Sequence, residues 1–308
     1  MGLKYGIIGV GAIGGFYGGR LANAGCDVHF LFHSEYNHVK EHGFQVDSVD
    51  GDFHLSDISV YNNSSDMPKC DVVLVSLKST QNHLLPTLLK PILHDSSMVI
   101  LIQNGLGLEA ELAQSFPQTT IAGGMAFICS SRVGLGHIHH KDYGSLNIGF
   151  YQRRNDAILE QFLLDCNLAG LTITVSEDLN SARWKKLVWN IPYNGLTVIL
   201  NMTTEEIMKN SSSRQLVKDM MEEVRAAALA NGAEMEESFI QDMLKMTDEM
   251  RPYSPSMKLD WDNGRPLEIR SIYLNPINEA RLGGCPMKKV EALAQSLMAI
   301  SEHKNFKP

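Results

Sequence analysis

Long apolar runs are missing from this 308-residue sequence. The longest aliphatic stretches lie at residues 72–75 and 98–102, whereas ~18 consecutive apolar residues are needed to cross a bilayer. We therefore expect no transmembrane helix and no membrane partner. The first residues lack a basic leader and pass directly into a strand-like segment, so we expect no secretory signal either.

Cysteine is scarce as well, and its pattern argues against two kinds of structural support. The five cysteines are scattered, odd in number and without a CxxC pair, which disfavours a disulfide framework and a zinc site. They are typical of reduced thiols, and we expect a cytoplasmic protein. His137 and His139 would share one face of a strand, beside His140. No third ligand follows at a typical spacing, so no metal site is expected.

Basic residues are outnumbered by acidic ones. The 27 Lys and Arg residues face 35 Asp and Glu residues, which gives a formal net charge of −8 at pH 7. A net-acidic chain without a basic stripe is a poor nucleic-acid binder. Any anionic ligand must therefore be held by helix dipoles and by a few well-placed cations.

Residues 1–178 have the pattern of an α/β domain. Short apolar runs alternate with helical stretches, as in a parallel sheet that is covered on both faces. The expected strands are 5–8, 28–32, 72–77, 99–103, 121–127 and 171–175, and the expected helices are 12–24 and 81–89. Residues 136–140 and 145–150 look like the two strands of a hairpin.

Residues 179–308 follow a different pattern, in which strand-like runs disappear. Helices are expected at 180–200, 213–231, 236–250 and 288–302. Eleven of the 15 methionines lie after position 200, and methionine is a good helix former. We therefore expect an all-helical C-terminal domain. The cleft between the two domains is the expected active site, because ligand pockets favour domain interfaces.

A glycine-rich turn follows the first expected strand. It reads Gly9, Val10, Gly11, Ala12, Ile13 and Gly14. In a GxGxxG turn the first glycine permits the tight bend, the second lets the backbone approach a pyrophosphate, and the third lets the helix pack closely on the strand. Strand, turn and helix occur in the order that a dinucleotide site requires. The alternative is that these glycines only allow tight packing; we expect an N-terminal Rossmann domain that binds a dinucleotide.

The end of the second expected strand bears on which dinucleotide is bound. NAD-specific sites place an acidic residue there for the ribose 2′-hydroxyl, but this sequence has His33, with Glu35 slightly late. A protonated His33, together with Lys78 at the end of another strand, would pair with a 2′-phosphate. NADP is therefore favoured, with NAD as the alternative because histidine is mostly neutral at pH 7.

A polar stripe stands out in the first helix of the second domain. Lys186, Asn190 and Asn194 are four residues apart, so a helix places all three on one face. Their neighbours are apolar, which predicts a buried helix whose polar groups need partners. The alternative is a solvated polar stripe. Pro192 lies inside the stretch and is expected to kink the helix, since it removes a backbone donor.

Three further polar residues attract attention by their position. Ser256 and Glu268 lie in a segment rich in proline and glycine, where surface loop residues are the simpler interpretation. Asn104 follows the strand at 99–103 and precedes Gly105. An Asn-Gly pair favours a turn, but the carboxyl end of a parallel strand is also where ligands bind.

Taken together, the chain resembles the ketopantoate reductase (2-dehydropantoate 2-reductase) family over essentially its whole length. The motifs that carry the resemblance are the glycine turn at 9–14, Leu77-Lys78 with Gln81, Gln103-Asn104-Gly105, the segment 184–190 with Asn194, and Ser254-Pro255-Ser256-Met257 followed by Glu268. The lysine segment and the serine–glutamate spacing are its specific parts, because the glycine turn is shared by many dehydrogenases.

The resemblance implies NADPH-dependent reduction of the 2-keto acid 2-dehydropantoate to pantoate in pantothenate biosynthesis. Lys186 would give a proton to the carbonyl oxygen as hydride arrives from C4 of the nicotinamide. Asn190, Asn194 and Ser256 would hold the hydroxyl and carboxylate of the substrate, and Glu268 would help to position Lys186 and the substrate.

The resemblance also assigns cofactor contacts. Asn104 would contact both the nicotinamide ribose side and the substrate, while Lys78 and Gln81 would lie near the adenosine 2′-phosphate. One residue departs from the family, which commonly has arginine at the position of His33. Histidine lacks the bidentate grip and the permanent charge of arginine, so NADH remains an alternative cofactor.

Two other functions stay open at this point. One is a related Rossmann reductase of another 2-keto acid, and the other is a nicotinamide-binding sensor without activity. The presence of all five polar residues of the second domain argues against the sensor, which needs only the first domain. The oligomeric state is also open, because the helical domain either presents an apolar face to a second copy in a homodimer or buries it internally.

Overall fold

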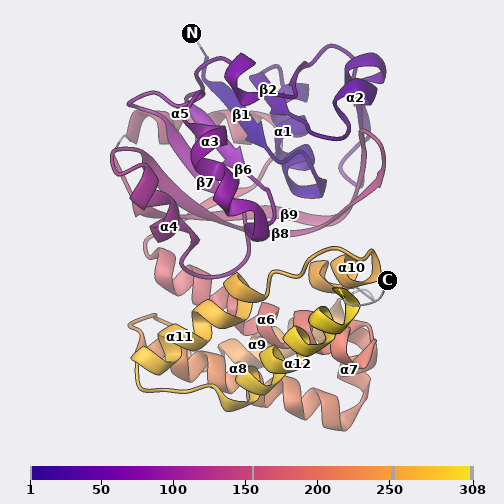
Figure 1. The fold of residues 1–308 in the computed structure, drawn as a ribbon, viewed down its shortest axis with the longest axis vertical. Coiled ribbons are helices and arrows are strands. Elements are labelled where there is room, and N and C mark those ends of the chain that lie inside the picture. Colours follow the sequence, from indigo (N-terminus) through magenta and orange to yellow (C-terminus); the bar gives the residue numbers. More distant parts are fainter. Residues whose placement is uncertain (1, 155, 251–253, 306–308) are drawn as a thin grey trace. The chain divides into compact units, whose positions relative to one another are not determined.

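The computed structural model describes residues 2–154, 156–250 and 254–305 (Figure 1). The chain divides into two compact units. Met1–Gln103 and Leu108–Leu179 form the first unit, and Asn104–Gly107 and Asn180–Pro308 form the second. Within the described residues, no helix has the length and apolar character needed to span a membrane.

The first unit is built on a mixed sheet with ten strands in the part of the chain described. The strands are β1 (Lys4–Ile8), β2 (Asp27–Leu31), β3 (Phe44–Ser48), β4 (Phe53–Leu55), β5 (Ser59–Tyr61), β6 (Val72–Val75), β7 (Met98–Leu101), β8 (Thr120–Gly134), β9 (His137–Gln152) and β10 (Ile173–Ser176). Their order is β4-β3-β9-β8-β7-β6-β1-β2-β5, with β10 paired to β9. From β8 to β5 neighbouring strands run parallel. Both β6 and β7 are buried throughout, as expected for strands covered on both faces.

Helices cover both faces of this sheet. They are α1 (Ala12–Asn23), α2 (Tyr36–His42), α3 (Leu85–Leu89), α4 (Leu108–Ser115) and α5 (Asp156–Leu168), with 3₁₀ turns at Ser64–Asp66 and Ser79–Leu84. Phe16 of α1 and Phe162 of α5 share one apolar core with the strands. Leu89 of α3 and Leu112 of α4 belong to a second core. The expected Rossmann-type α/β fold is confirmed.

The hairpin expected at 136–140 and 145–150 is wrong. Both segments belong to the single strand β9, which pairs antiparallel with β8 (Figure 1). Between them, Tyr143 (φ 62°) and Gly144 (φ 125°) adopt left-handed backbone conformations, which are typical of tight turns. The ladder to β8 instead shifts register at this point, so the segment is a β-bulge within a continuous strand.

Residues 36–61 hold elements that the sequence pattern did not predict, namely α2, β3, β4 and β5. The strands β4 and β5 have three residues each and no buried side chain. Strands this short and exposed show no clear hydrophobic period, so pairing with β3 and β2 decides their conformation. The helix expected at 81–89 begins as a 3₁₀ turn and becomes α-helical only at Leu85.

The second unit is helical throughout its described residues, which confirms the expected all-helical domain. It contains α6 (Leu179–Leu200), α7 (Thr204–Lys209), α8 (Ser211–Ala230), α9 (Phe239–Glu249), α10 (Ser256–Asp262), the π-helical turn η3 (Arg270–Leu274), α11 (Asn275–Leu282) and α12 (Lys288–Asn305). Figure 1 shows α12 running alongside α8, with which it packs. The core between these helices includes Trp184, Val217 and Leu297, each fully buried.

Candidate active site

The glycine turn joins β1 to α1 in the first unit. Gly9 has a left-handed conformation (φ 94°), and a Cβ atom there would lie 2.6 Å from the backbone nitrogen of Leu77. A Cβ atom on Gly14 would lie 2.3 Å from the Gly9 carbonyl oxygen, which also accepts a hydrogen bond of 2.6 Å from the Ser76 hydroxyl. These two glycines are therefore required by close packing between helix and strands.

Gly11 is different, because its surroundings are open. No heavy atom of the described residues lies within 4 Å of the position of a Cβ atom. Gly11 is the N-cap of α1, gives no side-chain cap, and no acidic residue stands in the first turn. The start of α1 is therefore open at Gly11. The positive end of the helix dipole and the first backbone amides lie there, which is the arrangement that a pyrophosphate group requires. The turn fits a dinucleotide.

The predicted 2′-phosphate residues follow the carboxyl ends of β2 and β6. His33 is exposed just after β2, and Lys78 caps the 3₁₀ turn that follows β6. Gln81 is exposed in this turn, where its backbone N–H donates to the Lys78 carbonyl at 2.9 Å. Both strands are parallel neighbours of β1, so their carboxyl ends meet at one edge of the sheet.

Glu35, the acidic residue that comes late after β2, faces into the protein. Its side chain is 5% exposed and pairs with the Arg132 guanidinium. Its second oxygen accepts a hydrogen bond of 2.9 Å from the Gly136 amide. Because this carboxylate is bonded to Arg132 of β8 and to Gly136 in the following turn, it is poorly placed to bind a ribose 2′-hydroxyl.

In the second unit, α6 carries the polar stripe into the interior. Asn190 and Asn194 are 5% and 2% exposed, and Lys186 is half-buried. The solvated-stripe alternative is therefore wrong. The Asn190 side-chain nitrogen is buried and has no hydrogen-bond partner among the described residues. A buried donor without a partner is costly, so this amide is suited to an oxygen of a bound ligand.

Burial dominates the acid–base properties of Lys186. Burial and, to a smaller extent, the nearby Arg183 guanidinium lower the pKa of Lys186, Glu268 acts in the opposite direction, and the result is a pKa of about 7. Glu268 is itself buried, 5% exposed, directly before the helical turn that leads into η3. It is therefore not the surface loop residue of the simpler interpretation. A lysine with a pKa near 7 can release its proton at neutral pH.

Ser256 is brought to the stripe by a contact between helices. The Asn194 side-chain oxygen accepts a hydrogen bond of 3.3 Å from the Met257 amide at the start of α10. Ser256 precedes Met257 and is the first residue of that helix. The side chain of Asn194 thus holds the first turn of α10, which begins at Ser256.

Asn104 belongs to the same unit as Lys186, although it follows a strand of the first. In the loop Asn104–Gly107, the Leu106 amide donates to the Ser271 carbonyl at 3.0 Å, and the Leu106 carbonyl accepts from the Asn275 side chain at 2.7 Å. Gly105 has a φ of 114° and passes so close to Ser271 that a Cβ atom would lie 2.4 Å from that residue's Cβ. The loop is therefore docked on η3, the turn that follows Glu268.

Comparison with known proteins identifies the family. The model of the ketopantoate reductase PanE/ApbA family matches residues 5–153, and that of its C-terminal domain matches residues 178–301. The chain belongs to the ketopantoate reductase family.

Individual relatives cover almost the whole chain. A 2-dehydropantoate 2-reductase from Nostoc sp. is 48% identical over 299 residues, which is 96% of this chain and 94% of that protein. The crystal structure of 2-dehydropantoate 2-reductase from Geobacter metallireducens has 37% identity and a TM-score of 0.93, and covers 97% of this chain and 100% of its own. D-mandelate dehydrogenase, solved with NADH and anilino(oxo)acetate, shares the fold at 20% identity with a TM-score of 0.89, covering 99% of this chain and all of its own.

Arg183 lies beside Lys186 of the candidate site, and the sequence pattern did not single it out. It is 2% exposed, one helical turn before Lys186, and its charge lowers the pKa of that lysine. The missed signal was the spacing, because residues 183, 186, 190 and 194 form one stripe on a helix.

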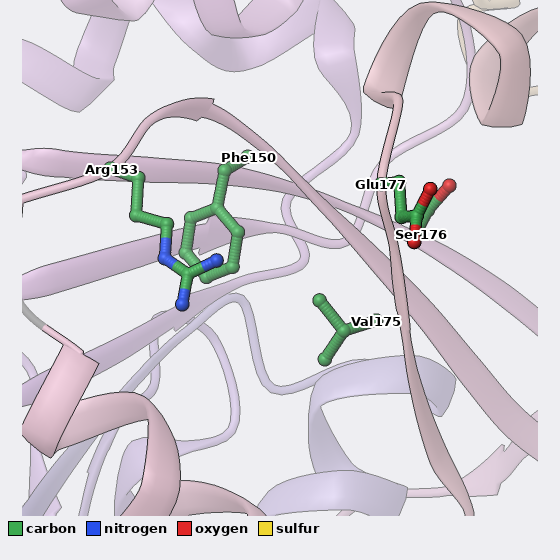
Figure 2. Close-up of a pocket in the computed structure, with 5 residues that line it drawn as sticks. All are labelled: Phe150, Arg153, Val175, Ser176 and Glu177. Atoms are coloured by element: carbon green, nitrogen blue, oxygen red, sulfur yellow. The ribbon is translucent and has the colours of Figure 1, made fainter.

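A pocket of about 180 Å³ in the first unit is lined by none of the predicted site residues. Figure 2 shows its lining, which consists of Phe150, Arg153, Val175, Ser176 and Glu177. The Arg153 guanidinium lies over the Phe150 ring, 5.2 Å from its centroid, and pairs with Asp156 at 2.6 Å.

No group of three or more metal-binding side chains occurs within the described ranges.

Proposed function

We propose that this chain reduces 2-dehydropantoate to pantoate with NADPH, as a step of pantothenate biosynthesis. The observation that carries the proposal is a half-buried lysine with a pKa of about 7 on the same helix face as the buried side-chain amide of Asn190, whose nitrogen has no hydrogen-bond partner among the described residues. The similarity to the 2-dehydropantoate 2-reductase from Nostoc sp. supports the substrate.

The residues of the second unit have complementary roles in this proposal. Lys186 protonates the carbonyl oxygen of the keto acid, where negative charge builds up during reduction. The Asn190 amide donates to a substrate oxygen, and Asn194 and Ser256 bind the substrate hydroxyl and carboxylate without adding charge near the lysine. Glu268 holds the ammonium group in place and opposes part of the pKa shift that burial causes.

The residues of the first unit hold the cofactor. The reduced nicotinamide, when bound, supplies the hydride for the keto carbon. Gly11 and the first amides of α1 receive the pyrophosphate, and His33, Lys78 and Gln81 receive the 2′-phosphate of NADPH. The ion pair of Glu35 with Arg132 supports NADPH, since this carboxylate is then not free to repel that phosphate.

The initial rate of NADPH oxidation, followed by absorbance, tests the proposal directly. We expect turnover with 2-dehydropantoate and NADPH that exceeds the rates with pyruvate-like 2-keto acids. Turnover of another keto acid alone would identify a related reductase of the same family. NADPH binding without turnover of any acid in the panel would favour a nicotinamide-binding sensor.

The rate should depend on pH through Lys186. Because the protonated lysine donates the proton, kcat for keto acid reduction should be constant below its pKa of about 7 and fall about 10-fold per pH unit above it. The reverse oxidation of pantoate needs the neutral lysine and should rise over the same range. Profiles of kcat at saturating NADPH and keto acid, and at saturating NADP and pantoate, check both directions; two parallel profiles would contradict this role.

Replacing His33 with arginine should strengthen the grip on the 2′-phosphate. Arginine adds a permanent charge and a bidentate contact, so we expect the KM for NADPH to fall by about 10-fold, which corresponds to ~1.4 kcal/mol. The KM for NADH should stay unchanged, since NADH lacks the phosphate. His42→Arg, at an exposed position that ends α2, adds the same charge away from the strand end. An equal fall of the KM for NADPH in both variants would mean that the added positive charge acts at long range and not through a contact of residue 33 with the 2′-phosphate.

A further inference from the structure

The helix that carries the polar stripe contains a proline within that stripe. Pro192 lies inside α6, between Asn190 and Asn194. Since proline has no backbone N–H, it cannot donate to the carbonyl four residues earlier, and its ring crowds that carbonyl. Pro192 therefore removes the hydrogen bond that the Val188 carbonyl would otherwise accept, which weakens the backbone of α6 beside the two asparagines. A contact from another element can support the helix at this point.

The Tyr273 hydroxyl contacts the backbone of α6 directly before Pro192. It donates a hydrogen bond of 2.8 Å to the Ile191 carbonyl, and the backbone N–H of Gly195 donates to the same hydroxyl. In a regular α-helix these two backbone groups pair with each other. The fully buried Tyr273 side chain thus places its oxygen against both of these backbone groups of α6.

Gly195 makes this close approach possible. A Cβ atom at this position would lie 2.7 Å from the Tyr273 hydroxyl and 2.6 Å from Leu293 Cδ2. Any larger residue would push the ring away from the helix backbone. The glycine inside a buried helix therefore has a packing reason, despite its cost of about 1 kcal/mol in helix propensity relative to alanine.

The other end of Tyr273 belongs to the turn that organises the rest of the site. The residue lies in η3, a π-helical turn, and such turns are rare and frequent at functional sites. Ile272 in this turn donates its amide to the Glu268 carbonyl at 3.2 Å, and the carbonyl of Ser271 accepts from Leu106 in the loop of Asn104. One turn therefore contacts the glutamate segment, the asparagine loop and the stripe helix.

We propose that Tyr273 is a positioning residue for substrate binding, whose hydroxyl sets the spacing between Asn190 and Asn194 and ties α6 to the Glu268 turn. This inference rests on the proposed function, in which the two asparagines hold the oxygens of a 2-keto acid. Tyr273 itself takes no part in proton transfer. Its loss should therefore misplace the substrate, and misplacement by about 1 Å can cost as much as 10²-fold in rate.

Tyr273→Phe tests this, because it removes the hydroxyl and keeps the ring in the core. We expect the KM for 2-dehydropantoate to rise about 10-fold, with the Kd for NADPH within about twofold of the unsubstituted protein. Tyr193→Phe is the matched control. Tyr193 lies on α6 itself and is as fully buried as Tyr273, but its hydroxyl donates to the Met208 sulfur at 3.0 Å and not to the helix backbone. A similar change of KM in both variants, or an unchanged KM in Tyr273→Phe, would overturn the proposal.

Hydrogen exchange of the Gly195 amide provides a test that does not depend on turnover. Tyr273→Phe should accelerate this exchange about 10-fold or more, whereas Tyr193→Phe should leave it unchanged. If the unsubstituted protein reduces no keto acid, the proposed function fails, and the exchange experiment still decides whether the hydroxyl holds the helix. Equal hydrogen-exchange rates of the Gly195 amide in all three proteins would refute this role of the Tyr273 hydroxyl.

Discussion

Replacing Lys186 with alanine is expected to lower kcat for 2-dehydropantoate reduction by about 10²- to 10⁴-fold, the usual contribution of a general acid. The ammonium group both stabilises the developing oxyanion and supplies its proton, and water in a buried site replaces neither function efficiently. The Kd for NADPH should not change, because Lys186 is not among the residues proposed to contact the cofactor. Steady-state kinetics and fluorescence titration with NADPH measure the two quantities separately.

The neighbouring lysine offers a matched control for this substitution. Lys185 precedes Lys186 on α6, and its side chain forms an ion pair with Glu236 at 3.2 Å. Lys185→Ala removes the same charge from the chain but should change kcat by less than about twofold, since exposed ion pairs contribute little. If the Lys186→Ala variant retained full turnover while Lys185→Ala lost it, the general acid would have been assigned to the wrong lysine.

Gly11→Ala is expected to weaken NADPH binding by about 10- to 100-fold without destabilising the protein. Gly11 has a φ of −96°, which alanine adopts without strain, and the space around its Cβ position is open among the described residues. The added methyl group would instead occupy the space where a pyrophosphate approaches the backbone. Thermal unfolding without cofactor should match that of the unsubstituted chain, while a titration reports the weaker binding.

Gly14→Ala should show the opposite behaviour and serves as the contrast. Its methyl group would lie 2.3 Å from both the Gly9 carbonyl oxygen and the Ser76 hydroxyl. Such overpacking costs typically 1–3 kcal/mol, roughly, so a clear decrease in melting temperature is expected even without NADPH. A Gly11→Ala variant with unchanged NADPH affinity would mean that the dinucleotide does not cross this turn.

The sequence alone determined those features that depend on local spacing. The GxGxxG turn follows a strand and opens a helix, and each glycine has a steric role that can be read from its position. Lys186, Asn190 and Asn194 share a helix face because of the 3.6-residue period. Likewise, the change from alternating strands to continuous helical stretches near residue 179 distinguishes the two kinds of fold.

Only the tertiary structure decided which of these polar groups are buried and what they contact. Glu268 stands in a Pro- and Gly-rich segment that is typical of a surface loop, yet packing of the helical unit buries it near Lys186. Glu35 comes slightly late for a contact with a ribose, and its ion pair is with Arg132 on a strand almost a hundred residues later. Such long-range partners leave no periodic trace in the sequence.

The same limit explains the two features on which the further inference depends. Pro192 marks the middle of α6 as unusual, but no local pattern indicates that the hydroxyl of Tyr273, 82 residues away from Ile191, bonds to the helix backbone there. Nor does the Asn104-Gly105 pair indicate that its loop docks on Ser271. Local spacing determines which side chains share a face, whereas long-range packing determines which of those faces become buried and therefore reactive.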